Sequence, residues 1–500
     1  MRALTFFLLL FSGSLSMAET DAERATALYF NSIQTQPKKL SAFLYAMPKG
    51  GDLHTHLGGA SRAENMLRYA KQDNLCVNAQ NFAVHTDLSC PKQYSVAQLQ
   101  SFPRFYTQTI DAWSMQNFRP GKESGHDHFF ASFEKYLPIL VKHRSEMVNE
   151  VVERACRENL LYLELMIMPD NNRSGLLGSE LAWDTHLNRL REKLLKVVIP
   201  VVQDISQQLD SYQKQLQVFL KGAGKQQCPN FKLRYLYQVL REQPPTQVFA
   251  QLLTGFELAS RDPRVVGINL VQAEEGKLSM RDYSLQMRMV GFLHRRYPRV
   301  KISLHAGELV PGLVPMNGLR FHIRQAVEIA QTDRIGHGVD IPYEDQSAQL
   351  LQEMAKKKIL VEINLSSNAA ILNVKGQHHP ILLYRQYHVP VALSTDDEGV
   401  LRTNLTEQFK LAVLNYHFSY LTLKQLVRNS IQYSFLPGAS LWQDANYKHP
   451  VSSCKDSLNT GQLTSCCQRF LTVNEKADGL WKLERQFVKF EQRFIKRHCH

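Results

Sequence analysis

Eight strand-length runs, all but the first of them mainly apolar, alternate with helix-length segments along most of this chain, and this alternation constrains the fold more than any other feature. The runs cover residues 51–56, 160–168, 232–240, 265–271, 300–304, 334–339, 359–365 and 389–394. Short apolar runs are typical of parallel strands that are covered on both faces, and such strands need long crossover connections. Eight strand–helix units predict an α/β fold, a closed (β/α)₈ barrel of the TIM type with N-terminal helices and helical insertions.

Length allows two or three domains, or one α/β barrel with insertions, and the composition narrows the possible partners. The 500 residues are 44% hydrophobic and 21% charged, as in ordinary globular proteins. The formal net charge of +13 is dispersed along the chain, and its densest run, Lys356-Lys357-Lys358, is typical of a solvated helix face. We therefore expect no nucleic-acid partner. No apolar run reaches the roughly 18 residues of a membrane-spanning helix, so we expect no membrane span.

The N-terminus has the features of a secretory signal. Basic Arg2 precedes an apolar run that ends at Phe11, and small residues occupy positions 16 and 18. We expect cleavage after Ala18 and a secreted or periplasmic protein. The expected organisation is a signal peptide at 1–18, a helical extension at 19–47, the barrel at 48–436 and a cysteine-containing helical tail at 437–500.

Apolar spacing predicts one helix from Ala22 to Tyr45 and two helices between Leu181 and Leu220, broken near Pro200. The eight cysteines match no zinc-ribbon spacing, so export favours disulfides. Cys76 and Cys90 flank one polar loop and form the expected local bridge. Cys156 and Cys228 are expected to be buried free thiols. The pairing among the tail cysteines stays open: Cys454, Cys466, Cys467 and Cys499.

Polar residues gather where several of the predicted strands end, which is where barrel enzymes have their active sites. His54 and His56 end the first run and share one strand face because strand side chains alternate. His305 ends the fifth run, and Asp396 and Asp397 follow the last. Three histidines and one carboxylate can hold one divalent cation, with zinc favoured and iron or another transition ion as alternatives. Four unrelated polar residues would not be expected to fall in these places.

Two further residues are candidates for proton transfer. Glu308 lies three residues after His305 and can act as a proton donor, and His337 ends the sixth run between two glycines, where it can act as a base toward water. Spacing alone leaves open which of Asp396 and Asp397 binds metal and which meets substrate.

Five motifs occur together in order: Met47-Pro48-Lys49, His54-x-His56, His305-Ala306-Gly307-Glu308, Gly336-His337-Gly338 and Ser394-Thr395-Asp396-Asp397. On these residues the chain resembles the adenosine deaminase family, and with its signal peptide it resembles the secreted growth-factor branch. The resemblance implies one Zn²⁺ per chain, bound by His54, His56, His305 and Asp396. It also implies that Glu308 protonates the purine ring, that His337 orients and deprotonates the water, and that Asp397 meets the N7 side.

The function implied by the resemblance is hydrolysis of adenosine, and of 2′-deoxyadenosine, to inosine and ammonia by zinc-activated water. The alternatives are an amidohydrolase acting on another aminopurine nucleoside derivative, and a secreted nucleoside-binding or growth-factor-like protein. The expected partner is a small purine nucleoside, and a homodimer is the candidate assembly. Two positions depart from the family pattern, because Gly58 replaces an acidic ribose contact and Gln272 replaces a glycine near purine N3. Ribose recognition should therefore differ, with Glu274 and Glu275 as candidates.

Overall fold

The computed structural model describes residues 20–86, 90–121, 123–222, 228 and 230–495, so the expected signal peptide lies outside the described residues. The chain forms two compact units. The larger is Phe30–Phe435, and the smaller combines the described parts of Met1–Tyr29 and Leu436–His500. Within the described part of the chain, every helix falls short of the length and apolar character that a bilayer span requires.

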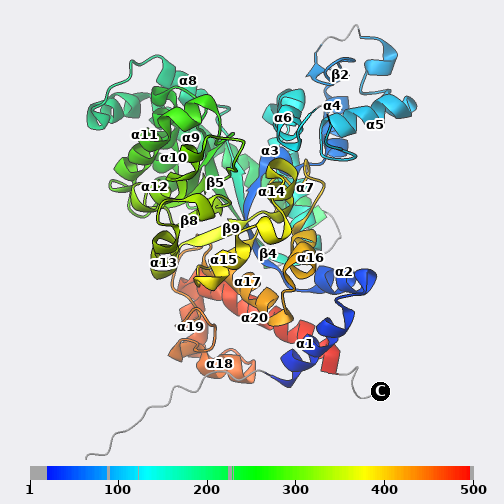
Figure 1. Ribbon diagram of the computed structural model, residues 1–500, viewed down its shortest axis with the longest axis vertical. Helices are drawn as coiled ribbons and strands as arrows, with labels where there is room; N and C mark the ends of the chain where they lie inside the picture. Colours follow the sequence, from blue (N-terminus) through cyan, green and yellow to red (C-terminus); the bar gives the residue numbers. More distant parts are fainter. Residues whose placement is uncertain (1–19, 87–89, 122, 223–227, 229, 496–500) are drawn as a thin grey trace, which may run out of the picture. The chain divides into compact units, whose positions relative to one another are not determined.

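The larger unit is built on eight parallel strands whose spatial order follows the chain order (Figure 1). They are β1 (Gly50–His56), β4 (Leu160–Ile167), β5 (Lys232–Leu240), β6 (Val265–Val271), β7 (Lys301–Ala306), β8 (Arg334–His337), β9 (Leu360–Ile363) and β10 (Val391–Leu393). A parallel bridge between Thr55 and Asp396 joins β1 to the residues after β10, which closes the ring. The predicted (β/α)₈ barrel is confirmed.

Helices surround the barrel and fill the long insertions between its strands. Those of the larger unit are α2 (Pro37–Ala46), α3 (Leu57–Ala60), α4 (Ala63–Gln72), α5 (Pro103–Ala112), α6 (Gly125–Lys142), α7 (Arg144–Arg157), α8 (Arg173–Ser179), α9 (Leu187–Gly222), α10 (Pro245–Arg261), α11 (Lys277–His294), α12 (His322–Glu328), α13 (Ser347–Lys357), α14 (Leu365–Leu372), α15 (Ile381–Gln386), α16 (Leu405–Tyr416) and α17 (Tyr420–Gln432). The insertion after β1 also contains an antiparallel pair that the sequence did not predict, β2 (Cys76–Val77) and β3 (Val84–His85).

Short 3₁₀ segments complete the connections: η1 (Lys92–Tyr94), η2 (Leu99–Ser101), η3 (Met316–Leu319), η4 (Ile341–Tyr343), η5 (Gly376–His378) and η6 (Ser452–Cys454). The smaller unit contains α18 (Lys455–Thr460), α19 (Ser465–Val473) and α20 (Glu475–Ile495), and α1 (Asp21–Ile33) begins in it. Within the smaller unit the Tyr29 and Phe494 rings lie 4.9 Å apart.

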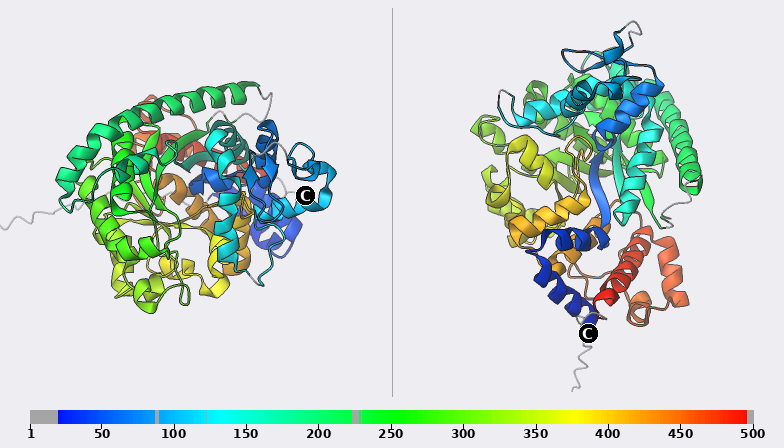
Figure 2. Two further views of the ribbon diagram at one scale, coloured as in Figure 1. Left: turned by 90° about the horizontal axis from the view of Figure 1, so that it is seen from above. Right: turned by 90° about the vertical axis from the view of Figure 1, so that its right-hand side faces the viewer.

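Both long-helix predictions were wrong. The segment from Ala22 to Tyr45 is two helices, α1 and α2, because Pro37 occupies the first turn of α2, where its missing N–H is tolerated. The segment around Pro200 is instead one helix, α9, as Figure 2 shows. The Pro200 ring is exposed, while neighbouring Val198 and Val201 are buried. Packing of this apolar face against α7 and α10 carries the helix past the proline.

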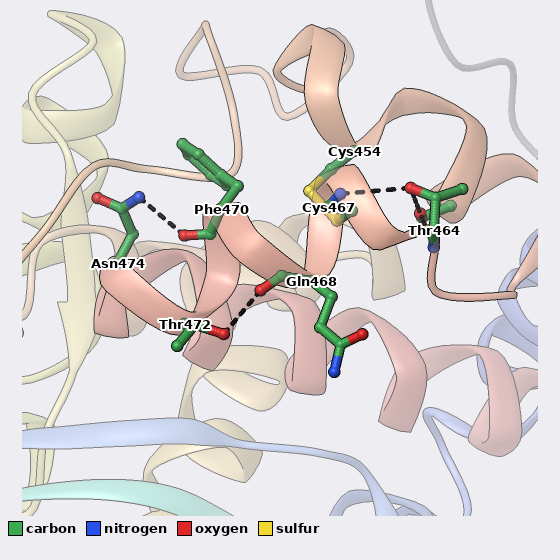
Figure 3. The surroundings of a disulfide bond; sticks show 8 residues. Cys454, Thr464, Cys467, Gln468, Phe470, Thr472 and Asn474 are labelled. Carbon is green, nitrogen blue, oxygen red and sulfur yellow. Dashed lines mark hydrogen bonds between the residues drawn. A yellow bond between two sulfur atoms is a disulfide. The ribbon is translucent and has the colours of Figure 1, made fainter.

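The described cysteines form three disulfides. Cys76–Cys90 is the local bridge that was expected, and Cys454–Cys467 joins η6 to α19 in the smaller unit. Figure 3 shows this second bridge beside Thr464, whose hydroxyl accepts a hydrogen bond from Cys467 N at the start of α19. Cys466 is exposed and unpaired, and Cys499 lies outside the described residues.

The expectation that Cys156 and Cys228 are free thiols was wrong, because they form the third disulfide. Cys156 lies four residues before β4 and Cys228 four residues before β5. These strands are parallel neighbours, so their N-terminal ends meet at the same end of the barrel and bring the two cysteines together. The matched spacing before each strand was the available signal.

Replacing both Cys156 and Cys228 with serine is expected to lower the free energy of unfolding by about 2–4 kcal/mol. The bridge spans 72 residues of sequence, so its loss releases a long loop in the unfolded chain. Urea denaturation of the purified protein measures the change, and Cys466→Ser is the control with no expected effect. Equal stability of the double variant and the wild type would contradict the pairing.

Candidate metal centre

The four predicted metal ligands meet at the C-terminal end of the barrel. His54 and His56 come from β1, His305 from β7, and Asp396 follows β10. His305 Nε2 lies 3.1 Å from His54 Nε2 and 3.2 Å from His56 Nε2. Asp396 Oδ1 lies 3.4 Å from His56 Nε2 and 3.7 Å from His54 Nε2. All four side chains are buried.

Each of the three histidines has an oxygen acceptor at its other ring nitrogen. The pairs are His54 Nδ1 with Glu362 Oε2 at 2.7 Å, His56 Nδ1 with Gln238 Oε1 at 3.2 Å, and His305 Nδ1 with Asn269 Oδ1 at 2.8 Å. An imidazole that donates its Nδ1 proton to oxygen keeps a lone pair on Nε2. Three such lone pairs and a carboxylate oxygen therefore converge on one point.

This convergence fits a divalent metal ion. Nitrogen lone pairs about 3 Å apart repel one another unless a cation lies between them. Zinc–nitrogen bonds of about 2.0–2.1 Å in a tetrahedral arrangement separate the nitrogens by about 3.4 Å. The observed separations of 3.1 and 3.2 Å are close to this value. The residues present can therefore hold one metal ion, with histidine and carboxylate ligands of the kind that zinc prefers.

A buried ionic network orients His54 from behind. Glu362 on β9 accepts hydrogen bonds from Ser303 Oγ at 2.9 Å and Arg334 Nε at 2.5 Å, and Arg334 also pairs with Glu164. Burial opposes ionisation of Glu362, but the Arg334 guanidinium and the hydrogen bond from His54 lower its pKa below the ordinary value. The carboxylate is therefore charged and fixes the His54 ring with Nε2 toward the metal position.

Replacing Glu362 with glutamine is expected to weaken zinc binding by about 10–100-fold. Glutamine keeps the shape but is a weaker acceptor for His54 and leaves Arg334 with one charged partner. Competition with a chelating dye measures the zinc affinity, and the melting temperature reports whether the variant folds. Glu353→Gln, which removes a surface partner of Lys357, is the matched control. Unchanged affinity in a folded Glu362→Gln variant would contradict this role.

Glu308 lies beside the ligand cluster and is held there by its backbone. Glu274 accepts hydrogen bonds from the N–H groups of Gly307 at 3.0 Å and Glu308 at 2.8 Å. The Glu308 carboxyl is 3.5 Å from His337 Nδ1. Burial and the nearby charge of Asp396 raise the pKa of Glu308 well above its usual range. Glu308 can therefore carry a proton at neutral pH.

His337 ends β8 in the left-handed conformation, with φ of 68°. Asn368 Nδ2 donates a hydrogen bond to His337 Nδ1 at 2.9 Å, and His379 Nε2 donates to Asn368 Oδ1 at 3.0 Å. The His379 contact fixes which way the Asn368 amide points. Burial lowers the pKa of His337 to about 3, so its imidazole is neutral. Its Nε2 lies 3.8 Å from Asp396 Oδ2, on the metal side of the site.

Asp397 follows Asp396 directly, and its carboxyl group lies close to the side chains of the predicted ligands His56 and Asp396. Its Oδ1 is buried without a hydrogen-bond partner among the described residues. A Cβ atom at Gly59 would lie 1.8 Å from Asp397 Oδ1, so glycine is needed there for the carboxyl to fit. Burial and the neighbouring Asp396 raise the pKa of Asp397 well above its usual range. An unpartnered acid beside the ligands can hydrogen-bond a substrate.

Gln272 follows β6 in the left-handed conformation, with φ of 79°, a conformation that favours glycine. Its side-chain Oε1 accepts a hydrogen bond from Glu242 N at 3.0 Å, and its carbonyl accepts one from Arg241 Nε at 2.8 Å. The side chain is therefore engaged with Glu242. The structure brings the other predicted site residues together, whereas the Gln272 side chain is hydrogen-bonded to Glu242.

Sequence reasoning missed the residues that hold the ligands and His337 in place: Gln238, Asn269, Glu362 and Asn368. Glu274, which was expected as a candidate for ribose recognition, is instead fully buried and hydrogen-bonded to Gly307, Glu308 and His322. Gln238, Asn269 and Glu362 lie inside strands that are otherwise mainly apolar. A polar side chain within a buried strand must find a partner, so each of these was a detectable signal. Their partners depend on the barrel register, which the sequence does not give.

Known proteins resemble this chain in sequence and in fold. The sequence model of the family described as adenosine deaminase matches residues 107–441. An adenosine deaminase of Clostridium perfringens is 24% identical over 390 residues, which covers 77% of this chain and 93% of that protein. One from Clostridium kluyveri is 22% identical over 402 residues, which covers 79% of this chain and 92% of that protein.

Two solved structures show the same fold. The adenine deaminase from Arthrobacter aurescens has a TM-score of 0.53 at 16% identity, over 88% of this chain and 99% of that one. The N6-mAMP deaminase of Arabidopsis has a TM-score of 0.51 at 19% identity, over 79% of this chain and 96% of that one. With the family match spanning most of the barrel and the predicted ligands gathered at its C-terminal end, the chain belongs to the adenosine deaminase family.

Proposed function

We propose that this protein is a zinc-dependent hydrolase that converts adenosine to inosine and ammonia and also deaminates 2′-deoxyadenosine. The observation that carries the proposal is the convergence of three histidine lone pairs and Asp396 beside Glu308 and His337. The curated relatives from two Clostridium species, named adenosine deaminase, support it.

His54, His56, His305 and Asp396 would hold the zinc ion, which would supply Lewis-acid activation by lowering the pKa of a water molecule toward neutrality. His337 would orient the attacking water rather than deprotonate it, because its Nδ1 accepts a hydrogen bond from Asn368 and its single ring proton therefore lies on Nε2, on the metal side. As the water oxygen adds to purine C6, its proton would pass to the amino group. Glu308 gives its proton to ring nitrogen N1, which accepts the electron pair of the broken C6–N1 double bond. The C6–N6 bond then breaks and ammonia leaves with its electron pair and the proton from the water, while the C6 hydroxyl returns a proton to Glu308 as the C6 carbonyl of inosine forms.

Asp397 supports the binding of a purine in this orientation. The N7 atom of adenine is a hydrogen-bond acceptor, and the unpartnered Asp397 carboxyl is a donor when protonated. A purine that places N1 at Glu308 and N7 at Asp397 directs C6 toward the ligand cluster. Backbone groups near Gln272, rather than its side chain, are then the candidates for the N3 side.

The decisive test is ammonia release from adenosine and 2′-deoxyadenosine by the purified protein before and after metal removal. Turnover that falls on chelation and returns with zinc is the expected result. If one zinc is bound but neither nucleoside is turned over, the substrate would be another aminopurine derivative. Zinc binding with nucleoside affinity but no hydrolysis of any aminopurine would favour the nucleoside-binding alternative, and an absence of metal binding would contradict the site.

We also propose that the chain is exported to an oxidising compartment. Three cysteine pairs support this, because structural disulfides persist outside the cytosol and are rare within it. Expression from the full gene should give a mature protein that lacks residues 1–18. Recovery of the uncleaved chain in the cytosol would contradict the proposal.

A further inference from the structure

Helix α6 packs against α3 and α14, the segments that follow β1 and β9 at the C-terminal end of the barrel. At its start, a Cβ atom on Gly125 would lie 2.1 Å from the Ala370 carbonyl of α14, which follows β9. Further along α6, Leu140 lies over Gly58 after β1, where a glycine Cβ would be 3.4 Å from Leu140 Cδ1. Figure 1 shows α6 together with α3 and α14, which it contacts.

The first turn of α6 also reaches the loop after β6. His126 Nε2 lies 2.7 Å from Glu275 Oε1, and His126 Nδ1 lies 3.0 Å from Asp127 Oδ1. The loops after β1, β6 and β9 occupy separate sectors of the eight-stranded ring. A helix that touches all three must cross the open end of the barrel, so the His126–Glu275 pair lies at the mouth.

Glu275 is close to the reacting part of the site. It follows Glu274 directly, and Glu274 holds the backbone N–H of Glu308. The side chains of Glu275 and His126 are 15% and 19% exposed, so both can be reached from the mouth while being held in place.

The proposed orientation of the purine determines what faces this pair. In adenosine, N9 carries the sugar and lies on the opposite side of the ring system from C6. A base with C6 at the ligand cluster therefore directs its sugar outward to the mouth. No acidic side chain is available after His56, because the position is Gly58.

We propose that Glu275, anchored by His126, recognises the sugar hydroxyl groups of the substrate and excludes a 5′-phosphate, so that the enzyme selects nucleosides over nucleoside monophosphates. This inference rests on the proposed function. The carboxylate accepts hydrogen bonds from hydroxyl groups, whereas a phosphate dianion is repelled by it. With Asp127 on the other ring nitrogen, the cluster has two carboxylates for one imidazole, so it has no net positive charge to attract phosphate.

The test measures kcat/KM for adenosine, 2′-deoxyadenosine and AMP, together with the inhibition constant of AMP against adenosine. Glu275→Gln is expected to lower kcat/KM for adenosine by about threefold to tenfold through KM, and to raise the AMP-to-adenosine ratio by at least about tenfold. AMP should also inhibit this variant more tightly than the wild type. These effects follow from removal of one negative charge with the side-chain size unchanged.

Two further variants distinguish an effect of the Glu275 charge from an effect of a less ordered loop. Glu123→Gln is the matched control, because Glu123 pairs with His128 in the same segment, and His128 is otherwise bound to carbonyls of Asp111 and Ser114 within the insertion. Its substrate ratio should equal that of the wild type. His126→Gln keeps the Glu275 charge and should raise KM for adenosine while selectivity against AMP is retained.

Three outcomes would overturn the inference: efficient use of AMP by the wild type, the same substrate ratio in Glu275→Gln as in Glu123→Gln, or equal loss of selectivity in the Glu275 and His126 variants. The last outcome would mean that selectivity depends on the ordering of the loop and not on the Glu275 charge. Absence of adenosine turnover in the wild type would instead contradict the proposed function, so the two failures are distinguishable.

Discussion

Replacing Glu308 with glutamine is expected to lower kcat for adenosine by about 10²–10⁴-fold while the bound zinc is retained. Glutamine has the same shape and can still donate a hydrogen bond to purine N1, but it has no proton to transfer. The backbone N–H of residue 308 keeps its hydrogen bond to Glu274 in the variant, so the loop should not move. The loss is therefore assigned to proton transfer.

The measurement combines steady-state kinetics with the zinc content of the purified variant. Glu328→Gln, which removes an exposed partner of Arg324, is the matched control and should keep wild-type kinetics. Retention of kcat in Glu308→Gln would place the proton donor elsewhere. Loss of zinc from this variant would make Glu308 a ligand and contradict its assignment as the acid.

The environments of Glu308 and His337 support this division of roles. Burial raises the pKa of Glu308 and lowers the pKa of His337, so the carboxyl tends to keep its proton and the imidazole tends to stay neutral. A carboxyl that keeps its proton is suited to act as the general acid near neutral pH, and a neutral imidazole with its proton on Nε2 is suited to orient a water molecule. The two side chains lie 3.5 Å apart.

Asp396→Asn is expected to weaken zinc binding by more than about 100-fold, with a parallel loss of turnover. The change removes the charged ligand of the set and leaves three neutral imidazoles. Asparagine suits this position because Asp396 has a φ of 59°, a region in which asparagine is tolerated better than most residues. The backbone hydrogen bond from residue 396 N to the His54 carbonyl, 2.9 Å long, is unaffected by the substitution.

Asp397→Asn is the matched control, since it makes the same chemical change at the adjacent buried residue. It should retain zinc and lower kcat/KM for adenosine, because the carboxyl without a partner is available to substrate rather than to metal. The zinc content and zinc affinity of both variants measure the difference. The reverse result, with zinc lost from the Asp397 variant and kept by the Asp396 variant, would exchange the two roles.

The barrel, and the gathering of His54, His56, His305 and Asp396 at one end of it, were predictable from the sequence because both depend on local patterns. Eight strand-length runs gave the strands within a few residues, and parallel strands must present their C-terminal ends together. His54 and Asp396 lie far apart in the chain but at strand ends, so the topology alone brings them close. Spacing could not separate Asp396 from Asp397, because the direction of each side chain depends on the backbone after β10.

The supporting residues were not predicted, because their roles depend on register and packing between distant segments. Glu362 acts on His54 only because the ring order places β9 two strands from β1, with β10 between them, and Arg334 balances two carboxylates there. The Cys156–Cys228 bridge likewise follows from the pairing of β4 with β5. The continuity of α9 through Pro200 reflects tertiary packing that outweighs a local helix-breaking preference.

The seam of the barrel, where β1 meets the residues after β10, shares residues with the ligand set. Asp396 bridges to Thr55, and the Thr55 hydroxyl donates to the Asp396 carbonyl at 2.8 Å across 341 positions of sequence. Because ligands on both sides of the seam would bind one ion, metal loading and closure of the ring are thermodynamically linked. A bound ion would thus hold β1 and the residues after β10 together. Its removal should first increase amide hydrogen exchange in β1 and β10. Any substitution that destabilises this seam should weaken metal affinity by the same free energy.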